Sequence, residues 1–296
     1  MTIELTLPPT LSYSQANSVS VCGWRYALER LLDVPSQPSW AAVAGNGVHT
    51  ATEWWDEWTV AGEWVKDRAV IEKLFNDAFD KHIAERLEAQ PEFPTETWRA
   101  SGRASKQWPN KEDEAWWRAN GPAQVMSWVT WRTNNSQWEL APVGDSNGIE
   151  IAVKAELGGV TVRGYIDRLF HLGGVDLLCV DLKSGARVPD STDQLGTYKR
   201  LLEETYDVTP SHGCYWMSRT GGTTEMVDLS VYTKERVDYT YAATRKMQTE
   251  GLFLPKQSNM CSGCSVRDAC FAVGGKDSDL YPTPWEISTK LPDQSA

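Results

Sequence analysis

The chain has 296 residues, of which 41% are hydrophobic, and it carries a formal net charge of −11. This length and hydrophobic content suffice for one large domain with insertions or for two small ones, and they exclude a wholly disordered chain. The acidic balance speaks against a protein that coats nucleic acid, because such proteins are basic. It does not exclude a nuclease, since a metal site gathers carboxylates and a bound cation reverses the local field.

Neither a membrane helix nor a secretory signal is predicted. No apolar run reaches the roughly 18 residues that a membrane helix needs, and residues 1–5 lack a basic region followed by an apolar stretch. The cytoplasm is therefore the expected compartment. Three of the six cysteines lie in one short cluster, which favours metal ligation over a disulfide framework in a reducing compartment.

Helices are predicted for the first half of the chain. Ser14 is expected to cap the first of them, and a Pro- and Gly-punctuated connection follows the third. The last is rich in tryptophan and is expected to break at Gly121-Pro122. The predicted helical ranges are 14–33, 40–60, 66–88 and 113–140.

Most of the 15 tryptophans lie between Trp40 and Trp138. We expect them to fill contacts between helices, because aromatic side chains dominate protein cores. The alternative is that exposed tryptophans stack on unpaired bases.

The second half predicts a mixed sheet flanked by helices. Three strand-like runs are separated by Gly-Gly turns, and two more follow a helix that ends near Thr205. Thr233 is expected to cap a helix that reaches Glu250, and the Pro-containing tail after Gly274 is expected to be irregular. This order of elements is typical of an α/β fold with a mixed sheet. The predicted strands are 149–157, 160–170, 175–183, 211–218 and 223–231.

Two aspartates in apolar strands are candidate metal ligands. Asp167 ends the string GYID, and Asp181 lies two residues before Lys183, which puts the two charged groups on one face of a strand. A carboxylate in an apolar strand is costly unless it is paired or ligating. The carboxylates suit a hard divalent cation and the lysine can orient a water, so the pattern predicts metal-dependent hydrolysis. Gln194 and Tyr198 lie four residues apart on the next helix and face the same way.

Glu150 stands near the start of the first predicted strand. It is interpreted as an ordinary polar strand position, with a role as a metal ligand or as support for one as the weaker alternative.

The C-terminal region holds three cysteines with the spacing C-x2-C-x5-C, namely Cys261, Cys264 and Cys270. This spacing is that of metal ligands and requires a fourth thiolate. Alone, it predicts zinc at least as readily as an iron–sulfur cluster. Cys179 and Cys214 lie in apolar strands and are expected to be buried and inert.

The strings GYID, VDLKSG and QLGTY within residues 164–198 resemble the RecB-type branch of the PD-(D/E)XK nuclease superfamily. Residues 45–49, Gly-Asn-Gly-Val-His, look like the G-x-x-x-H element of that branch. The resemblance implies a restriction-endonuclease-like α/β fold with a helical N-terminal region and a C-terminal cysteine cluster. It implies magnesium or manganese on His49, Asp167 and Asp181. Catalytic or substrate-contacting roles are implied for Asp167, Asp181, Lys183, Gln194 and Tyr198.

The cysteines extend the resemblance to family members such as the AddB subunit and the CRISPR-associated RecB-like exonucleases. Those proteins hold an iron–sulfur cluster through one N-terminal cysteine and a C-terminal C-x2-C-x5-C set. Cys22 fits the first ligand, although Gly23 stands where the family usually has proline. The resemblance therefore implies a 4Fe–4S cluster on Cys22, Cys261, Cys264 and Cys270, with zinc as the alternative. Residues 90–145 are not explained by it.

We expect a metal-dependent DNA exonuclease that acts at single-stranded ends in recombination, repair or phage DNA processing. It has no G-x-x-x-x-G-K-[ST] phosphate loop, so it is expected to work without a fused helicase. The alternatives are a non-catalytic DNA-end-binding recombination partner and a zinc-stapled structural protein. DNA is the expected partner, a membrane is not, and a homo-oligomer or a recombination protein remains open. The expected parts are a helical region 1–145, a nuclease core 146–250 and a cluster loop with tail 251–296.

Overall fold

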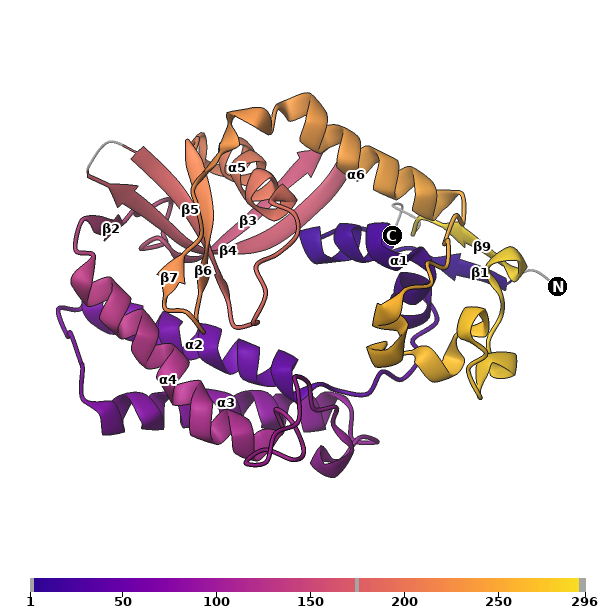
Figure 1. Ribbon diagram of the computed structural model, residues 1–296. Coiled ribbons are helices and arrows are strands. Elements are labelled where there is room, and N and C mark those ends of the chain that lie inside the picture. Colours follow the sequence, from indigo (N-terminus) through magenta and orange to yellow (C-terminus); the bar gives the residue numbers. More distant parts are fainter. Residues whose placement is uncertain (1–2, 174–175, 293–296) are drawn as a thin grey trace.

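The structure of the protein, a computed structural model, describes residues 3–173 and 176–292. A mixed sheet lies at its centre with helices on both faces (Figure 1), which is the fold class that the sequence predicts. Three helices cover one face: α2 (Trp40–Val60), α3 (Arg68–Ala89) and α4 (Glu114–Asn134). Two cover the other: α5 (Asp193–Tyr206) and α6 (Lys234–Thr249).

The sheet follows the order β2-β4-β5-β6-β7, with β3 on β4 and β8 on β6. Only β5 and β6 run parallel among these pairs. Their crossover is α5, as expected for a parallel pair. The strands are β2 (Trp138–Leu140), β3 (Ile149–Leu157), β4 (Val160–Leu172), β5 (Asp176–Lys183), β6 (His212–Met217), β7 (Gly222–Thr223) and β8 (Val227–Asp228).

Several predicted elements are confirmed. The β3–β4 hairpin turns at Gly158 and Gly159, which both have positive φ, and a Cβ at Gly158 would lie 2.1 Å from the carbonyl oxygen of Asp238. Thr233 caps α6 by accepting a hydrogen bond from the backbone N–H of Arg236. The third predicted strand began at residue 175, which lies outside the described residues.

Buried tryptophans fill contacts between helices, as predicted, for example Trp40 of α2 against Phe79 of α3, and they also fill the layer between these helices and the sheet. Trp128 of α4 packs edge-on against Trp216 of β6, with ring centroids 4.9 Å apart. The buried tryptophans of this layer are Trp40, Trp55, Trp98, Trp117, Trp128, Trp131, Trp138 and Trp216.

The predicted break at Gly121-Pro122 is wrong, because α4 runs through it without interruption. Gly121 serves packing instead: a Cβ there would lie 2.1 Å from the ring of Phe75 on α3. Pro122, which has no backbone N–H to donate, thus lies within α4 next to a close contact with α3.

Three further predictions need correction. Ser12, not Ser14, caps α1 (Tyr13–Arg30), because its hydroxyl accepts from Gln15 while the Gln15 side chain accepts from the Ser12 N–H. The predicted strand 223–231 is two short strands followed by the 3₁₀ turn η2 (Leu229–Val231). The tail after Gly274 contains a strand, described next.

The two ends of the described chain pack together. Strand β1 (Ile3–Thr6) pairs in parallel with β9 (Ile287–Lys290), and α1 shares a buried cluster with the C-terminal segment (Figure 1). The segment between α6 and β9 forms the 3₁₀ turns η3 (Asn259–Gly263), η4 (Arg267–Ala269), η5 (Phe271–Val273), η6 (Ser278–Leu280) and η7 (Pro284–Glu286). A further 3₁₀ turn, η1 (Thr95–Thr97), precedes α4. Within the described ranges, no helix combines the length and apolarity required to cross a bilayer.

Candidate metal centre

Asp167 lies where β4 separates from β5. The two strands pair over residues 168–172 and 176–180, and this pairing stops short of Asp167. Beyond this point the Asp167 side chain replaces the backbone pairing, because its Oδ2 accepts a hydrogen bond from the backbone N–H of Leu182 at 2.6 Å. Strand β5 is therefore no longer paired with β4 at Asp181, and the buried carboxylate of Asp167 contacts its backbone there instead.

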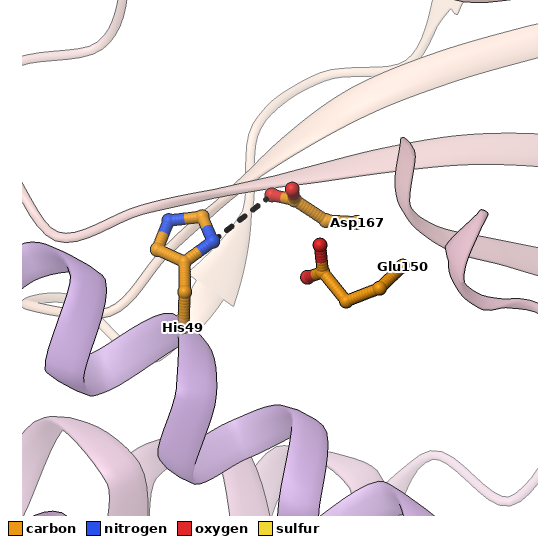
Figure 2. A group of neighbouring side chains, drawn as sticks. All are labelled: His49, Glu150 and Asp167. Atoms are coloured by element: carbon orange, nitrogen blue, oxygen red, sulfur yellow. Dashed lines mark ion pairs between the residues drawn. The ribbon is translucent and has the colours of Figure 1, made fainter. Parts of the chain in front are cut away.

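His49 reaches this point from α2. Its Nδ1 lies 3.4 Å from Oδ2 of Asp167 (Figure 2). Gly45, one turn earlier on the same helix face, lies against the loop that leaves β5, and a Cβ there would meet the hydroxyl of Ser184 at 2.7 Å. The glycine four residues before the histidine therefore lets α2 approach the end of β5.

Glu150 completes a group with His49 and Asp167. One ligand atom from each residue lies within 4.8 Å of the other two (Figure 2). Glu150 has a φ of +45°, a left-handed conformation that costs a side-chain-bearing residue about 1–3 kcal/mol. The β3–β4 pairing is interrupted there, between Ile149 and Ile151.

Burial and the neighbouring charge of Asp167 raise the pKa of the Glu150 carboxyl to about 7. Arg168 and His49 oppose this rise. Arg168 and His49 compensate the two carboxyls only in part, since the pKa of Glu150 stays raised, and a divalent cation would supply further positive charge. The donor set of nitrogen and oxygen therefore fits a metal ion.

A second network surrounds Asp181. Its Oδ1 accepts hydrogen bonds from Gln194 at 2.6 Å and from the Tyr198 hydroxyl at 2.9 Å. Lys183 donates to Oε1 of Gln194 at 2.9 Å. The predicted arrangement of Asp181 and Lys183 on one strand face is confirmed, with Nζ 2.6 Å from Oδ2 of Asp181.

Oδ2 of Asp181 makes that ion pair but no hydrogen bond to any described residue, although it is buried. Burial first, and then the charge of Asp167, raise the pKa of Asp181 to about 6, while Lys183 and His49 lower it. The two carboxylates are neighbours, because Asp167 accepts from the N–H of Leu182, the residue that follows Asp181. Oδ2 of Asp181 thus faces the Lys183 ammonium and has no further partner among the described residues.

The structure brings together all the residues predicted for hydrolysis, but their grouping differs from the prediction. The predicted metal ligands were His49, Asp167 and Asp181, whereas the tight group contains Glu150 in the place of Asp181. Asp181 belongs to the adjoining lysine network. Its role as a ligand stays a prediction, as do the roles of Lys183 and the other network residues.

A buried ionic network behind the centre was not predicted. Asp56 of α2 is fully buried and accepts from Nε of Arg168 at 2.6 Å, Nε of Arg132 at 3.2 Å and the Trp128 indole at 3.0 Å. Arg168 also donates to the backbone oxygen of Asp167 at 2.5 Å and to Glu150 at 3.3 Å. These bonds fix the metal centre to both α2 and α4. The only signal in the sequence was a second charged residue beside Asp167 in an apolar strand.

The four predicted cluster cysteines line one small cavity between α1 and the C-terminal turns. Backbone N–H groups point at the sulfurs, with Lys256 donating to Cys22 and Ser258 to Cys261, both at 3.4 Å. Helix α1 kinks at Cys22, and a Cβ at Gly23 would lie 3.0 Å from the backbone nitrogen of Leu254. The glycine that replaces the family's proline thus permits this close approach.

All four cluster cysteines are free thiols in this structure, and the choice between a 4Fe–4S cluster and a zinc ion stays a prediction. Cys179 and Cys214 are buried in the sheet, as predicted.

A family profile described as the PD-(D/E)XK nuclease superfamily matches residues 10–271. The chain belongs to the PD-(D/E)XK nuclease superfamily. The matched range includes all the residues of the candidate metal centre and all four cluster cysteines.

This nuclease-superfamily member is also similar to two phage proteins, each named "Gene 69 protein". The one from Mycobacterium phage L5 is 29% identical over 297 residues, covering 91% of this chain and 99% of its own. The one from Mycobacterium phage D29 is 28% identical over 269 residues, covering 88% and 96%. A crystal structure of a "Putative exonuclease" from Eubacterium rectale aligns with a TM-score of 0.43 at 11% identity, covering 86% and 87%. The family assignment rests on the profile and not on that structure.

Proposed function

We propose that the protein is a metal-dependent deoxyribonuclease that removes nucleotides from single-stranded DNA ends. The observation that carries the proposal is the meeting of His49, Glu150 and Asp167 with the Asp181–Lys183 pair where β4 leaves β5. This set combines hard oxygen and imidazole donors with a positioned ammonium, as hydrolysis of a phosphodiester requires.

His49, Glu150 and Asp167 would hold magnesium or manganese, and Asp181 could add Oδ2, the oxygen that pairs with Lys183. A divalent cation bound there would neutralise charge on the scissile phosphate and activate water. Lys183 would hold that water or a phosphate oxygen, since Asp181 and Gln194 fix its ammonium. Tyr198 restrains Gln194 and Asp181 from the helix side.

We further propose that Cys22, Cys261, Cys264 and Cys270 bind a 4Fe–4S cluster that joins the two ends of the chain. The shared cavity and the backbone donors to the sulfurs support this. The cluster would be structural, since its cysteines are separate from the hydrolytic group and no electron transfer is needed for hydrolysis.

We also propose that the enzyme acts as an exonuclease, that it prefers single strands and that it works in the cytoplasm. The likeness to phage proteins favours a role in phage DNA processing. A homo-oligomer or a recombination protein as partner remains a proposal, as does the division into parts at residues 145 and 250.

The test is an assay with single- and double-stranded oligonucleotides labelled at either end, with manganese, magnesium or a chelator. Stepwise shortening of the single strand with either metal and none with the chelator is the expected result. Binding without cleavage would instead support the non-catalytic DNA-end-binding protein. If protein purified anaerobically contains zinc and no iron, the four cysteines form a zinc site and not a 4Fe–4S cluster.

A further inference from the structure

The loop of residues 101–112 has a charge that contrasts with the rest of the molecule. It carries Arg103, Lys106 and Lys111, and no acidic residue occurs from 97 to 111, although the chain has a net charge of −11. All three cations are exposed. No carboxylate of a described residue lies within ion-pairing distance of them, whereas most other cations on the helices are paired. Arg99, a basic residue just before the loop, instead donates hydrogen bonds to the backbone oxygens of Gln37 and Gly263.

The loop has a fixed base. Ser101 and Glu112 form an isolated antiparallel bridge, and the backbone N–H of Glu112 donates to the Ser101 oxygen at 2.9 Å. Within the loop, the backbone N–H of Trp108 donates to the Ser105 hydroxyl at 3.0 Å, and that of Lys111 to the Trp108 oxygen at 3.1 Å. The loop is therefore closed upon itself, with Trp108 half-buried at its centre.

Arg219 ties this base to the metal centre. Its two terminal nitrogens donate to the Glu112 carboxylate at 2.8 and 2.9 Å, and its Nε donates to the backbone oxygen of Ser184 at 3.0 Å. Ser184 directly follows Lys183 in the chain. The pairing is bidentate and partly buried, and the hydrogen bonds to Arg219 lower the pKa of the Glu112 carboxyl. One arginine thus fixes a cationic loop to the end of the strand that bears Asp181 and Lys183.

We propose that the loop 101–112 binds the substrate strand, with Arg103, Lys106 and Lys111 on its phosphates and Trp108 against a base. This inference rests on the proposed function, because it names the partner of the same site. Uncompensated cations on an acidic protein attract a polyanion, and a tryptophan among them suits an unpaired base, which presents an open π face. The loop thereby gives a role to the part of the chain that the sequence resemblance leaves unexplained.

The test measures binding of a fluorescent oligothymidylate of twenty nucleotides by anisotropy, in the Lys183→Ala background so that the strand stays intact. The loop variant combines Arg103→Gln, Lys106→Gln and Lys111→Gln. The control variant carries the same charge change on other elements, Lys66→Gln, Arg68→Gln and Lys246→Gln. Thermal melting followed by circular dichroism checks that both variants fold like the parent.

The loop variant is expected to bind at least 10-fold more weakly, with the slope of log K against log salt reduced by about 2, since each lost phosphate contact reduces it by about 0.7. The control should bind within 2-fold of the parent. Trp108→Ala should weaken binding of the single strand by about 5-fold or more and leave binding of a blunt duplex of equal length unchanged. Equal losses in the loop and control variants, or unchanged binding by the loop variant, would overturn the proposal.

Hydrolysis of bis(p-nitrophenyl) phosphate, measured with the loop substitutions in the otherwise native chain, separates this inference from the proposed function. This small diester cannot span the loop, so its turnover should stay within 2-fold of the parent. Its loss would mean that the loop supports the metal centre and would overturn the strand-binding role. If the native chain hydrolyses neither substrate, the nuclease proposal fails while the anisotropy experiment still decides the loop. A parent that binds only duplex overturns the single-strand partner.

Discussion

The two candidate ligand sites of this chain differ in how their donors are held. In the metal centre the side chains lie on long helices and strands and bond to one another, as Asp181 does with Gln194 and Tyr198. In the cysteine cluster, Cys261 lies on a short 3₁₀ turn and Cys264 ends it, and the described thiols bond only to backbone groups. The side chains of the first site hold one another, whereas the cysteines of the second would gain a direct link from the cluster that we propose they bind. Changes in the two sites should therefore separate activity from stability.

The largest expected effect is on the rate of hydrolysis. Lys183→Ala and Asp181→Ala should each reduce cleavage of a labelled single strand on the order of 1000-fold or more, because one removes the ammonium and the other the carboxylate that fixes it. DNA binding should stay measurable, and the iron content should be that of the parent. Lys246→Ala, an exposed lysine on α6, is the matched control. Cleavage near the parent rate in either site variant would refute the assignment.

The next largest effect is expected for the buried ionic network of Asp56, Arg168 and Arg132, which connects the metal centre to the helices. Asp56→Asn leaves Arg168 and Arg132 buried without their counter-charge, which should cost about 3–5 kcal/mol of unfolding free energy in urea. Activity should fall as well, because Arg168 also contacts Glu150 and the backbone of Asp167. Glu57→Gln changes an exposed neighbour on the same helix and should do neither. A stable and fully active Asp56→Asn variant would show that the centre does not depend on this network.

The same network marks the limit of what the sequence could predict. The D-x-K spacing fixes Asp181 and Lys183 on one face because strand side chains alternate, and the structure agrees. The bend at Glu150 depends on a positive φ, which no local pattern signals, so its place beside His49 was underestimated. Arg168 could not be paired with Asp56 from sequence, since 112 positions separate them.

The helical half gives a second lesson of this kind. Pro122 predicts a break by the local rule, yet α4 continues through it. Gly121 packs on Phe75 of α3 at this point, a tertiary contact that the local sequence rule does not include. Local signals such as Thr233 before α6 succeeded where the cap lies next to its helix in the chain.

The cysteine cluster should show the opposite behaviour from Lys183. Cys22→Ser should lose iron and acid-labile sulfide and lower the unfolding free energy by about 2–4 kcal/mol, because the link to the distant Cys261 would be lost. Hydrolysis below the melting temperature should persist, since the hydrolytic residues are untouched. Cys214→Ser is the control: it lies in β6 and should keep the full iron content, even if its buried hydroxyl costs stability. Full iron in the Cys22 variant would rule out the cluster ligand set.

The smallest effect is expected for the histidine, because it is one ligand among several and is partly exposed. His49→Ala should raise the manganese concentration for half-maximal cleavage by about 10- to 100-fold, which corresponds to about 1.4–2.8 kcal/mol of binding free energy. The melting temperature without metal should change little, but the rise in melting temperature on adding manganese should shrink, because that rise reports binding to the folded state. His171→Ala, an exposed histidine on β4, is the control. If His49→Ala and the control titrate alike, Glu150 and the aspartates hold the cation without His49. The histidine would then only contact Asp167, and the centre would resemble a carboxylate site.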